Sequence, residues 1–218
     1  DGVRYEEFDW RDPYVYWNEE EQCYDMLLAS RIKGGGALRG GCIALCRSED
    51  LIHWSYEEPF YAPEMYITME CPELFQMGDY WYLVFSTFSD QFTTHYRIGK
   101  SPRGPWMIPE DDVFDTRSDY AIKTASDGKR RFAFGWIASK YGNCDFGPWE
   151  WGGTMVFHEL IQNPDDGTLR VKVIPGVRDF YSEPQEEKKA LAAGAKLQEC
   201  AGGIRIAADT LGAGLYEI

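Results

Sequence analysis

A polar residue stands at the head of one aromatic strand after another in this chain, and that repetition limits the fold more than any other feature. Short runs rich in Tyr, Trp, Phe and Val alternate with turns along residues 11–174, which predicts β-structure almost throughout. The chain runs 58 residues from Asp12 to Glu70 and 50 residues from Glu70 to Tyr120. A period near ~50 residues with four strands per unit predicts β-propeller blades, of which about three can be counted.

The head of each blade faces the central channel of a propeller, so we expect the repeat to gather Asp12, Glu70 and Asp119 in one place. A single β-sandwich would also show short strands at even spacing, but it would not place a special polar residue at the head of every unit. Beyond residue 176 the pattern changes, and a charged, Ala-rich run leads to a short β-like stretch within residues 201–218.

Two carboxylates in contrasting surroundings indicate the chemistry. Glu70 lies among apolar neighbours, directly before a Cys-Pro pair, and burial of this kind favours the protonated carboxyl group that a general acid needs. Asp12 follows Arg11, whose charge favours an ionised carboxylate. Such a pair is typical of enzymes that cleave glycosidic bonds. The competing interpretation is that both are ordinary strand-end residues, and we interpret Glu73 as a structural carboxylate.

Composition narrows the choice of partner. The sequence has 36 Asp and Glu against 22 Lys and Arg, a formal net charge of -14, which repels nucleic acids and anionic membranes. Aromatic residues make up 16% of the chain, with 8 Trp. Most of them are expected to fill a β core, but a few exposed indole rings in a carboxylate-lined pocket suit the apolar faces of a carbohydrate. No apolar run approaches the ~20 residues of a membrane span.

The six cysteines show no spacing typical of a metal or redox site, so neither a metal nor a cofactor is expected. Cys71 lies in the proposed active-site turn, where a free thiol packs as a small hydrophobic group. Reduced cysteines and the absence of a signal-like pattern in residues 1–20 favour a cytoplasmic location. Secretion is the alternative if an export signal was removed.

Two motifs carry a family resemblance. Trp10-Arg11-Asp12-Pro13 and Met69-Glu70-Cys71-Pro72, in that order and with the segment 48–54 between them, resemble those of glycoside hydrolase family 32, the group of invertases, inulinases and levanases. Further similarity lies in Asp119-Tyr120-Ala121, in Gly135-Trp136 and in the segment 151–160. The resemblance covers residues 8–175.

This resemblance implies a five-bladed β-propeller followed by a β-sandwich. The expected domains are then a partial propeller over 1–176, a linker over 177–200 and the beginning of a β-sandwich over 201–218. It also implies retaining cleavage of fructosyl linkages in sucrose, fructo-oligosaccharides or fructans, with Glu70 as acid/base and Asp12 as transition-state stabiliser. The substrate-binding candidates are Arg11, Cys71, Asp119, Tyr120, Trp136 and Trp151.

The chain departs from the family in one respect that concerns the reaction. The family's nucleophile is an Asp in the motif W-x-N-D-P-N-G, which does not occur here. We therefore expect the chain to be a fragment that hydrolyses fructosides negligibly by itself, with the missing N-terminal blades of the same protein as its partner. The alternatives are a degenerate protein, a non-catalytic carbohydrate-binding propeller, and an inverting hydrolase of the arabinosidase and xylosidase group. Open blade edges also suggest a homo-oligomer.

Overall fold

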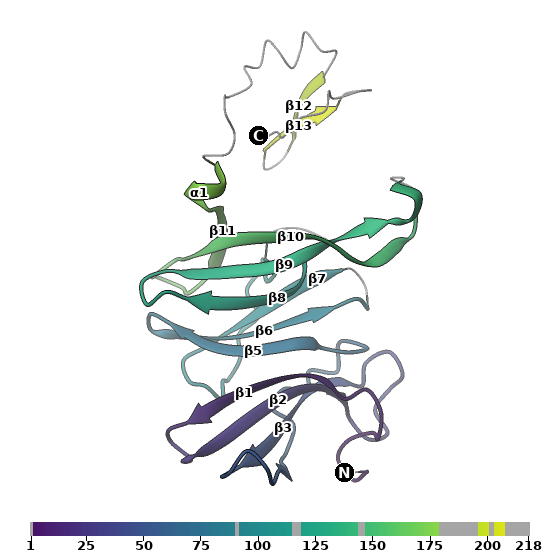
Figure 1. Ribbon diagram of the computed structural model, residues 1–218, viewed down its shortest axis with the longest axis vertical. Helices are drawn as coiled ribbons and strands as arrows, with labels where there is room; N and C mark the ends of the chain where they lie inside the picture. Colours follow the sequence, from purple (N-terminus) through teal and green to yellow (C-terminus); the bar gives the residue numbers. More distant parts are fainter. Residues whose placement is uncertain are drawn as a thin grey trace. The chain divides into compact units, whose positions relative to one another are not determined.

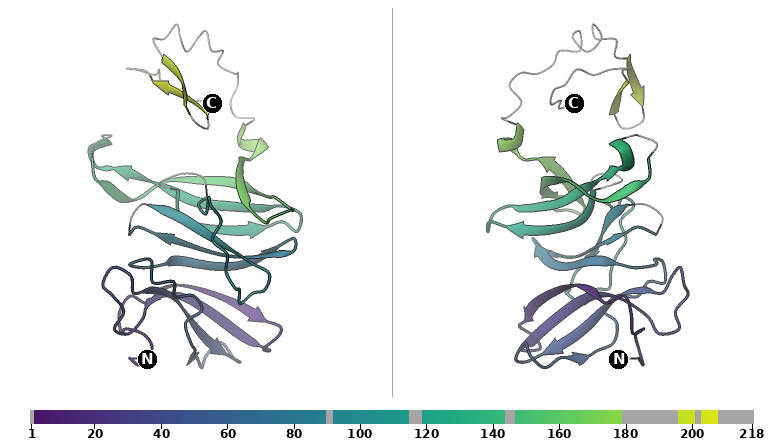
Figure 2. Two further views of the ribbon diagram at one scale, coloured as in Figure 1. Left: turned by 180° about the vertical axis from the view of Figure 1, so that it is seen from behind. Right: turned by 45° about the vertical axis from the view of Figure 1, so that its right-hand side comes forward.

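The computed structural model of the chain describes residues 2–89, 92–114, 119–143, 147–178, 196–200 and 203–207. It divides into two compact units, Asp1–Lys172 and Val173–Ile218. The first unit contains three antiparallel sheets that stack face to face, as the views from the front and from behind agree (Figures 1 and 2). The prediction of an all-β, propeller-type fold is confirmed.

The sheets follow one another along the chain as three blades. Blade 1 consists of β1 (Arg11–Asn18), β2 (Cys23–Arg31), β3 (Gly41–Ser48) and β4 (Ser55–Tyr56), paired in that order. Blade 2 consists of β5 (Glu70–Met77), β6 (Tyr80–Thr87) and β7 (Thr93–Gly99). Blade 3 consists of β8 (Asp119–Ser126), β9 (Arg131–Lys140), β10 (Trp149–Gln162) and β11 (Leu169–Val173). A short 3-10 turn, η1 (Tyr141–Asn143), follows β9.

Blade 2 has three named strands where four were predicted, because its outer edge is irregular. Isolated bridges join Ile98 to Met107 and His95 to Val113, so residues 107–113 take the place of a fourth strand. Pro109 interrupts this segment. Since proline has no N–H to donate, a continuous ladder cannot pass through it.

The second unit contains α1 (Pro175–Arg178) and a hairpin of β12 (Lys196–Cys200) and β13 (Gly203–Ala207). Strand β12 falls within 177–200, predicted as a linker, and β13 within 201–218, predicted as the beginning of a β-sandwich. The remaining residues of those ranges lie outside the described ones, and this boundary stays a prediction. In the part of the chain that the structure describes, no helix is long and apolar enough to cross a membrane.

The innermost strand of every blade begins with the same backbone irregularity. A β-bulge shifts the register between Arg11 and Tyr14, between Glu70 and Glu73, and between Tyr120 and Lys123. Inside each bulge one non-glycine residue has a left-handed backbone: Asp12 (φ 57°), Cys71 (φ 50°) and Ala121 (φ 54°). The residues that correspond between blades are therefore Arg11, Glu70 and Tyr120, each directly before the left-handed position. This alignment differs by one residue, in blades 1 and 3, from the predicted set of Asp12, Glu70 and Asp119.

Apolar side chains fill the interfaces between neighbouring blades. Between blades 1 and 2 the buried cluster comprises Leu27, Ile43, Leu45, Tyr66, Met69, Leu74, Leu83 and Phe85. Between blades 2 and 3 it comprises Phe75, Tyr82, Val84, Tyr96, Ile98, Phe114, Ile122, Ala133, Leu160 and Leu169. Alternate residues of β6 serve the two interfaces, because successive side chains of a strand point to opposite faces. Blade 2 is consequently buried on both sides, and each large side chain that is fully buried contributes about 1.5–3 kcal/mol.

A buried arginine anchors the outer segment of blade 2. The Arg97 side chain is completely buried, and it donates to the hydroxyls of Tyr61 at 3.0 Å and Tyr66 at 2.8 Å and to the carboxylate of Asp112 at 2.5 Å. Burial alone would raise the pKa of Asp112, but hydrogen bonds from His95 and Arg97 outweigh it and lower that pKa. A buried cation with this many acceptors stabilises the fold only while every partner is present.

We expect Arg97→Met to lower the free energy of unfolding by about 3–5 kcal/mol, because it leaves the Asp112 carboxylate without its buried cation. Urea denaturation followed by tryptophan fluorescence measures the loss. Arg130→Met is the matched control, since Arg130 forms an ion pair with Asp127 on the surface, where such pairs contribute about 0–1 kcal/mol. A loss below 1 kcal/mol for Arg97→Met would contradict this assignment.

Buried tyrosines make the stability of blades 2 and 3 sensitive to alkaline pH. The Tyr82 hydroxyl donates to the Gly167 carbonyl at 2.6 Å and accepts from Gln162 at 2.6 Å. Burial raises the pKa of Tyr82 to about 12. In the unfolded chain the same phenol ionises near pH ~10. Between these values the unfolded state binds fewer protons, so the stability present below pH ~10 is lost as the pH rises through the folded pKa.

The free energy of unfolding is therefore expected to fall above pH ~10, with Tyr82 contributing about 1.4 kcal/mol per pH unit until its folded pKa is reached. Tyr82→Phe should reduce this slope, although it also lowers stability at neutral pH. The control is Tyr141→Phe, because the Tyr141 ring is 69% exposed. Urea denaturation series at pH 8 to 11 compare the slopes, and equal slopes for Tyr82→Phe and the unaltered protein would refute the assignment.

Candidate active site

Side chains from all three blades meet at a single carboxylate. Arg11 of blade 1 donates from Nε to Oε1 of Glu70 at 2.9 Å, and the Tyr120 hydroxyl of blade 3 donates to Oε2. Glu70 itself begins β5 of blade 2 and is only 8% exposed. The three residues that precede the left-handed backbone positions thus form one cluster, which we call the head cluster: Arg11, Glu70 and Tyr120. Both oxygens of the carboxylate are oriented by donors from other blades.

The electrostatics of the head cluster keep Arg11 charged and Tyr120 neutral. Burial opposes the charge of Arg11, but hydrogen bonds to Asp9 and Glu70 outweigh it and raise the pKa of the guanidinium. The pKa of Tyr120 is raised far above its ordinary value, first by burial and then by its hydrogen bond to Glu70. Arg11 also donates to Thr68 Oγ1 at 3.0 Å, so its guanidinium group is hydrogen-bonded on several sides. A cation and a neutral hydroxyl donor therefore flank Glu70, whereas its neighbours in sequence had predicted apolar surroundings.

Asp12 is held by the backbone of the next blade. Its Oδ2 accepts the N–H of Cys71 at 3.0 Å, which joins two of the left-handed positions directly. The sequence predicted that the charge of the neighbouring Arg11 would act on this carboxylate. The Arg11 guanidinium bonds Asp9, Thr68 and Glu70, and the bond to Asp12 comes from the backbone amide. Burial, followed by the charge of Asp12, raises the pKa of the Cys71 thiol to about 12, so this thiol is not a nucleophile at neutral pH.

Asp119 lies on the other side of its strand from Tyr120. Successive residues of a strand point to opposite faces, and the Asp119 carboxylate lies 3.8 Å from Nδ1 of His158. Gly135 makes room for it, since a Cβ at that position would come within 2.7 Å of Asp119 Oδ1. The structure therefore brings Tyr120 to Glu70, and it places Asp119 beside His158.

Aromatic rings extend the head cluster on the side of blade 3. The Tyr120 ring lies 5.4 Å from Trp136 and 5.9 Å from Trp151, and these two indoles are 5.8 Å apart, measured between centroids. Trp151 is 67% exposed, so it offers a free face of the kind that stacks on sugar rings. Phe92, 4.7 Å from Tyr120, was not predicted, because it lies in a loop where no periodic pattern indicates its direction. We call Trp136, Trp151 and Phe92 the aromatic group.

Glu73 is used for structure. It is 3% exposed, and its carboxylate accepts from the Thr124 N–H at 2.8 Å and from the Thr124 hydroxyl at 2.6 Å. Arg131 lies 3.9 Å away. These contacts tie blade 2 to blade 3 and agree with the interpretation of Glu73 as a structural carboxylate.

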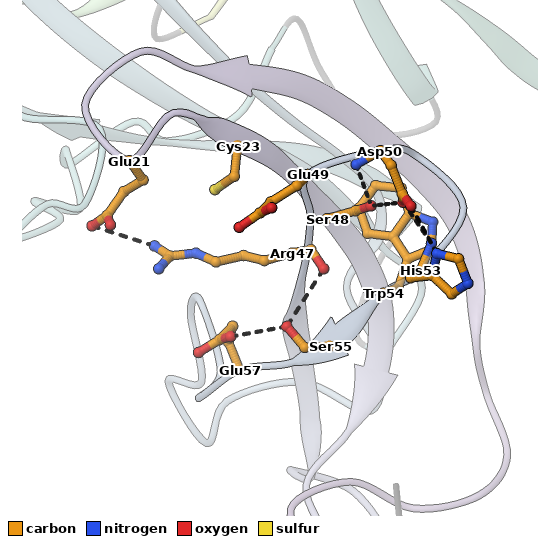
Figure 3. Close-up of a pocket in the computed structure, with 10 residues that line it drawn as sticks. All are labelled: Glu21, Cys23, Arg47, Ser48, Glu49, Asp50, His53, Trp54, Ser55 and Glu57. Atoms are coloured by element: carbon orange, nitrogen blue, oxygen red, sulfur yellow. Dashed lines mark hydrogen bonds and ion pairs between the residues drawn. The ribbon is translucent and has the colours of Figure 1, made fainter.

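A hollow of about 530 Å³ lies on blade 1 (Figure 3), and the length of β1 separates it from the head cluster. It is lined by Cys23, which pairs with Asn18 at the far end of β1 from Arg11. The two ends are seven residue steps apart along the strand, or about 23 Å. Several side chains of the hollow pair with one another, with Glu21 3.6 Å from Arg47 and the Ser55 hydroxyl donating to Glu57 at 3.2 Å. Among the described residues no group of His, Cys, Asp and Glu side chains is arranged to hold a metal ion.

Comparison with known proteins places this geometry in a family. The model of the glycosyl hydrolases family 32 N-terminal domain matches residues 3–170. A levanbiose-producing levanase of Geobacillus stearothermophilus is 26% identical over 152 residues, which are 69% of this chain and 31% of the levanase. The chain thus spans less than a third of the length of that relative.

Solved structures share the fold at low sequence identity. Fructan 1-exohydrolase IIa from Cichorium intybus is similar with a TM-score of 0.59 and 17% identity, over 82% of this chain and 37% of that one. A thermostable family-43 glycoside hydrolase is similar with a TM-score of 0.58 and 15% identity, over 78% of this chain and 59% of that one. The fold is therefore shared across two hydrolase families, whereas the family-32 match extends over most of the sequence. The chain belongs to glycosyl hydrolase family 32.

Proposed function

We propose that this chain supplies the acid/base and the transition-state stabiliser of an enzyme that hydrolyses fructosyl linkages in sucrose, fructo-oligosaccharides or fructans. The observation that carries the proposal is the position of Glu70, fixed by Arg11 and Tyr120 within reach of the aromatic group. A carboxyl group with both oxygens oriented, beside a free indole face, suits a glycosidic oxygen and the sugar attached to it. The levanase similarity supports fructosyl linkages as the substrate class.

The proposed reaction is the retaining one. Glu70 gives its proton to the leaving oxygen while a second carboxylate attacks the anomeric carbon, and Glu70 then takes a proton from the water that releases the fructosyl group. Asp12 would bind ring hydroxyls more strongly as positive charge develops on the sugar, and only such differential binding accelerates the reaction. The attacking carboxylate must stand ~5 Å from the acid/base. Since the nucleophile motif is absent from the sequence, we propose that another polypeptide segment provides it and that these 218 residues alone are inactive.

The outer faces of blades 1 and 3 indicate how such a segment would be accommodated. Phe157 and Met155 of β10 are 43% and 69% exposed, whereas Leu160, on the opposite face of that strand, is buried against blade 2. On blade 1, Val15 and Trp17 are 42% and 41% exposed. Between neighbouring blades the corresponding faces are buried. We propose that further propeller blades of the same protein cover these faces, with association of two copies as the alternative.

A non-catalytic carbohydrate-binding propeller is the second candidate function. The absent nucleophile motif and the exposed Trp151 ring favour it, because stacking on a sugar requires no nucleophile. The inverting, family-43-like alternative has the shared fold in its favour. The levanase similarity and the family-32 match favour the fructosyl hydrolase over both.

In the full-length product of the gene, Glu70→Gln is expected to lower kcat on sucrose and levan by about 10²–10⁴-fold, the usual contribution of a general acid. A nitrophenyl fructoside should lose less in its first step, because nitrophenolate leaves without a proton. Glu58→Gln is the control, since Glu58 pairs with Arg4 on the surface. Release of fructose at the unaltered rate by Glu70→Gln would end the assignment, and a full-length protein that binds fructans without turnover would establish the binding module instead.

The isolated chain is expected to self-associate through its exposed blade faces, and Phe157→Lys should weaken that association. Sedimentation velocity over a hundredfold range of concentration measures it. Ile52→Lys is the control, because Ile52 is 75% exposed in the loop between β3 and β4. Two outcomes would contradict this prediction: a chain that remains monomeric at every concentration, or an equal effect of the two substitutions. Either would show that the exposed face of blade 3 does not mediate association.

A further inference from the structure

A lysine of blade 3 reaches the inner strands of both other blades. Lys123 Nζ donates to the Pro72 carbonyl of blade 2 at 2.9 Å, and it lies 4.9 Å from the centroid of the Tyr14 ring of blade 1. Tyr14 in turn donates its hydroxyl to the Leu74 carbonyl at 2.8 Å. One ammonium group therefore contacts the first strands of two blades from the first strand of the third.

The contacts of Lys123 flank the bond between Asp12 and Cys71. Pro72 follows Cys71 directly, and Tyr14 comes two residues after Asp12. The Cys71 N–H donates to Asp12 Oδ2 at 3.0 Å, and we call this bond the clamp. Both of its residues have left-handed backbones, each at a cost of about 1–3 kcal/mol that persists only where surrounding contacts enforce it. Lys123 supplies one such contact on either side.

Carboxylates near Lys123 also act on its charge. Burial lowers the pKa of the ammonium, while the charges of Glu73 and Asp12 act in the opposite direction. Glu73 already accepts two hydrogen bonds from Thr124 and lies near Arg131. A partly buried ammonium needs carboxylates around it, and Asp12 is the one at the candidate active site.

We propose that Lys123 is a positioning residue: by bonding the Pro72 carbonyl next to Cys71 and lying against the Tyr14 ring two residues after Asp12, it holds the clamp closed and keeps the stabilising carboxylate in register with Glu70. The role of Asp12 in this statement rests on the proposed function, whereas the effect on the clamp does not. Lys123 acts through Asp12 and Cys71 and need not touch the sugar. Its side chain, on blade 3, fixes the position of backbone atoms in blade 2.

Amide hydrogen exchange of the sugar-free chain tests the proposal, because the clamp contains a backbone N–H. In Lys123→Met we expect the Cys71 amide to exchange at least 10-fold faster relative to the Leu83 amide, which lies in the buried core of blade 2. Lys123→Arg, which keeps a charge and donors, should restore slow exchange at least in part. Lys100→Met is the matched control, since Lys100 lies 3.4 Å above the Tyr80 ring, away from the inner strand heads.

A merely structural role predicts a different result. Cys71 and Leu83 would then exchange faster by the same factor in Lys123→Met, and that outcome overturns the proposal. If Lys123→Met does not fold, Lys123→Gln, which keeps a donor but carries no charge, allows the same comparison. Because no sugar or turnover is involved, a full-length protein that fails to release fructose would refute the proposed function and leave the clamp result standing.

Discussion

The left-handed residue at the head of each inner strand is the constraint on which the rest of the site depends. The left-handed backbone conformation, which is unfavourable for residues other than glycine, occurs at Asp12, Cys71 and Ala121. Each of these residues lies in a β-bulge that changes the direction of the preceding side chain. In consequence three side chains converge although Arg11 and Tyr120 lie 59 and 50 residues from Glu70 in sequence. Without the bulges, ordinary strand alternation would continue from the head, and the side chains around Glu70 would be different ones.

Convergence gives Glu70 an environment that no single blade could provide. A carboxylate this deeply buried needs hydrogen-bond partners for both oxygens, and Arg11 and Tyr120 supply them from opposite sides. The same contacts restrict the carboxylate to one orientation, which lowers the entropic cost of reaching a glycosidic oxygen. The aromatic group adds an apolar surface next to this polar one. Under the proposed function, Glu70 would act as the proton donor and the aromatic group would stack on the sugar.

Blade stacking explains both the stability of the middle of the molecule and the exposure at its ends. Blade 2 buries both of its faces, and polar links such as those of Arg97 and Glu73 fix its neighbours. Among the residues that the structure describes, blades 1 and 3 each carry exposed apolar side chains on the outer face of a strand, Val15 and Trp17 on blade 1 and Met155 and Phe157 on blade 3. Exposed apolar side chains that gather on one face mark a surface that binds a partner, and this is the basis of our proposal that further blades cover these faces.

The sequence by itself determined the all-β character, the repeat of about three blades and the motif residues Asp12 and Glu70, because strand alternation, turn residues and polar strand heads are local signals. It also identified Trp136 and Trp151 as aromatic candidates. Only the tertiary structure decided that Arg11 and Tyr120 contact Glu70, that Asp119 turns toward His158, and that Asp12 bonds the Cys71 amide. The physical reason is that a bulge changes which face a side chain takes, and the contacts that enforce it, such as that of Lys123 with Pro72, come from blades distant in sequence. A periodic pattern within one segment of the chain does not indicate which residues of other blades will contact that segment.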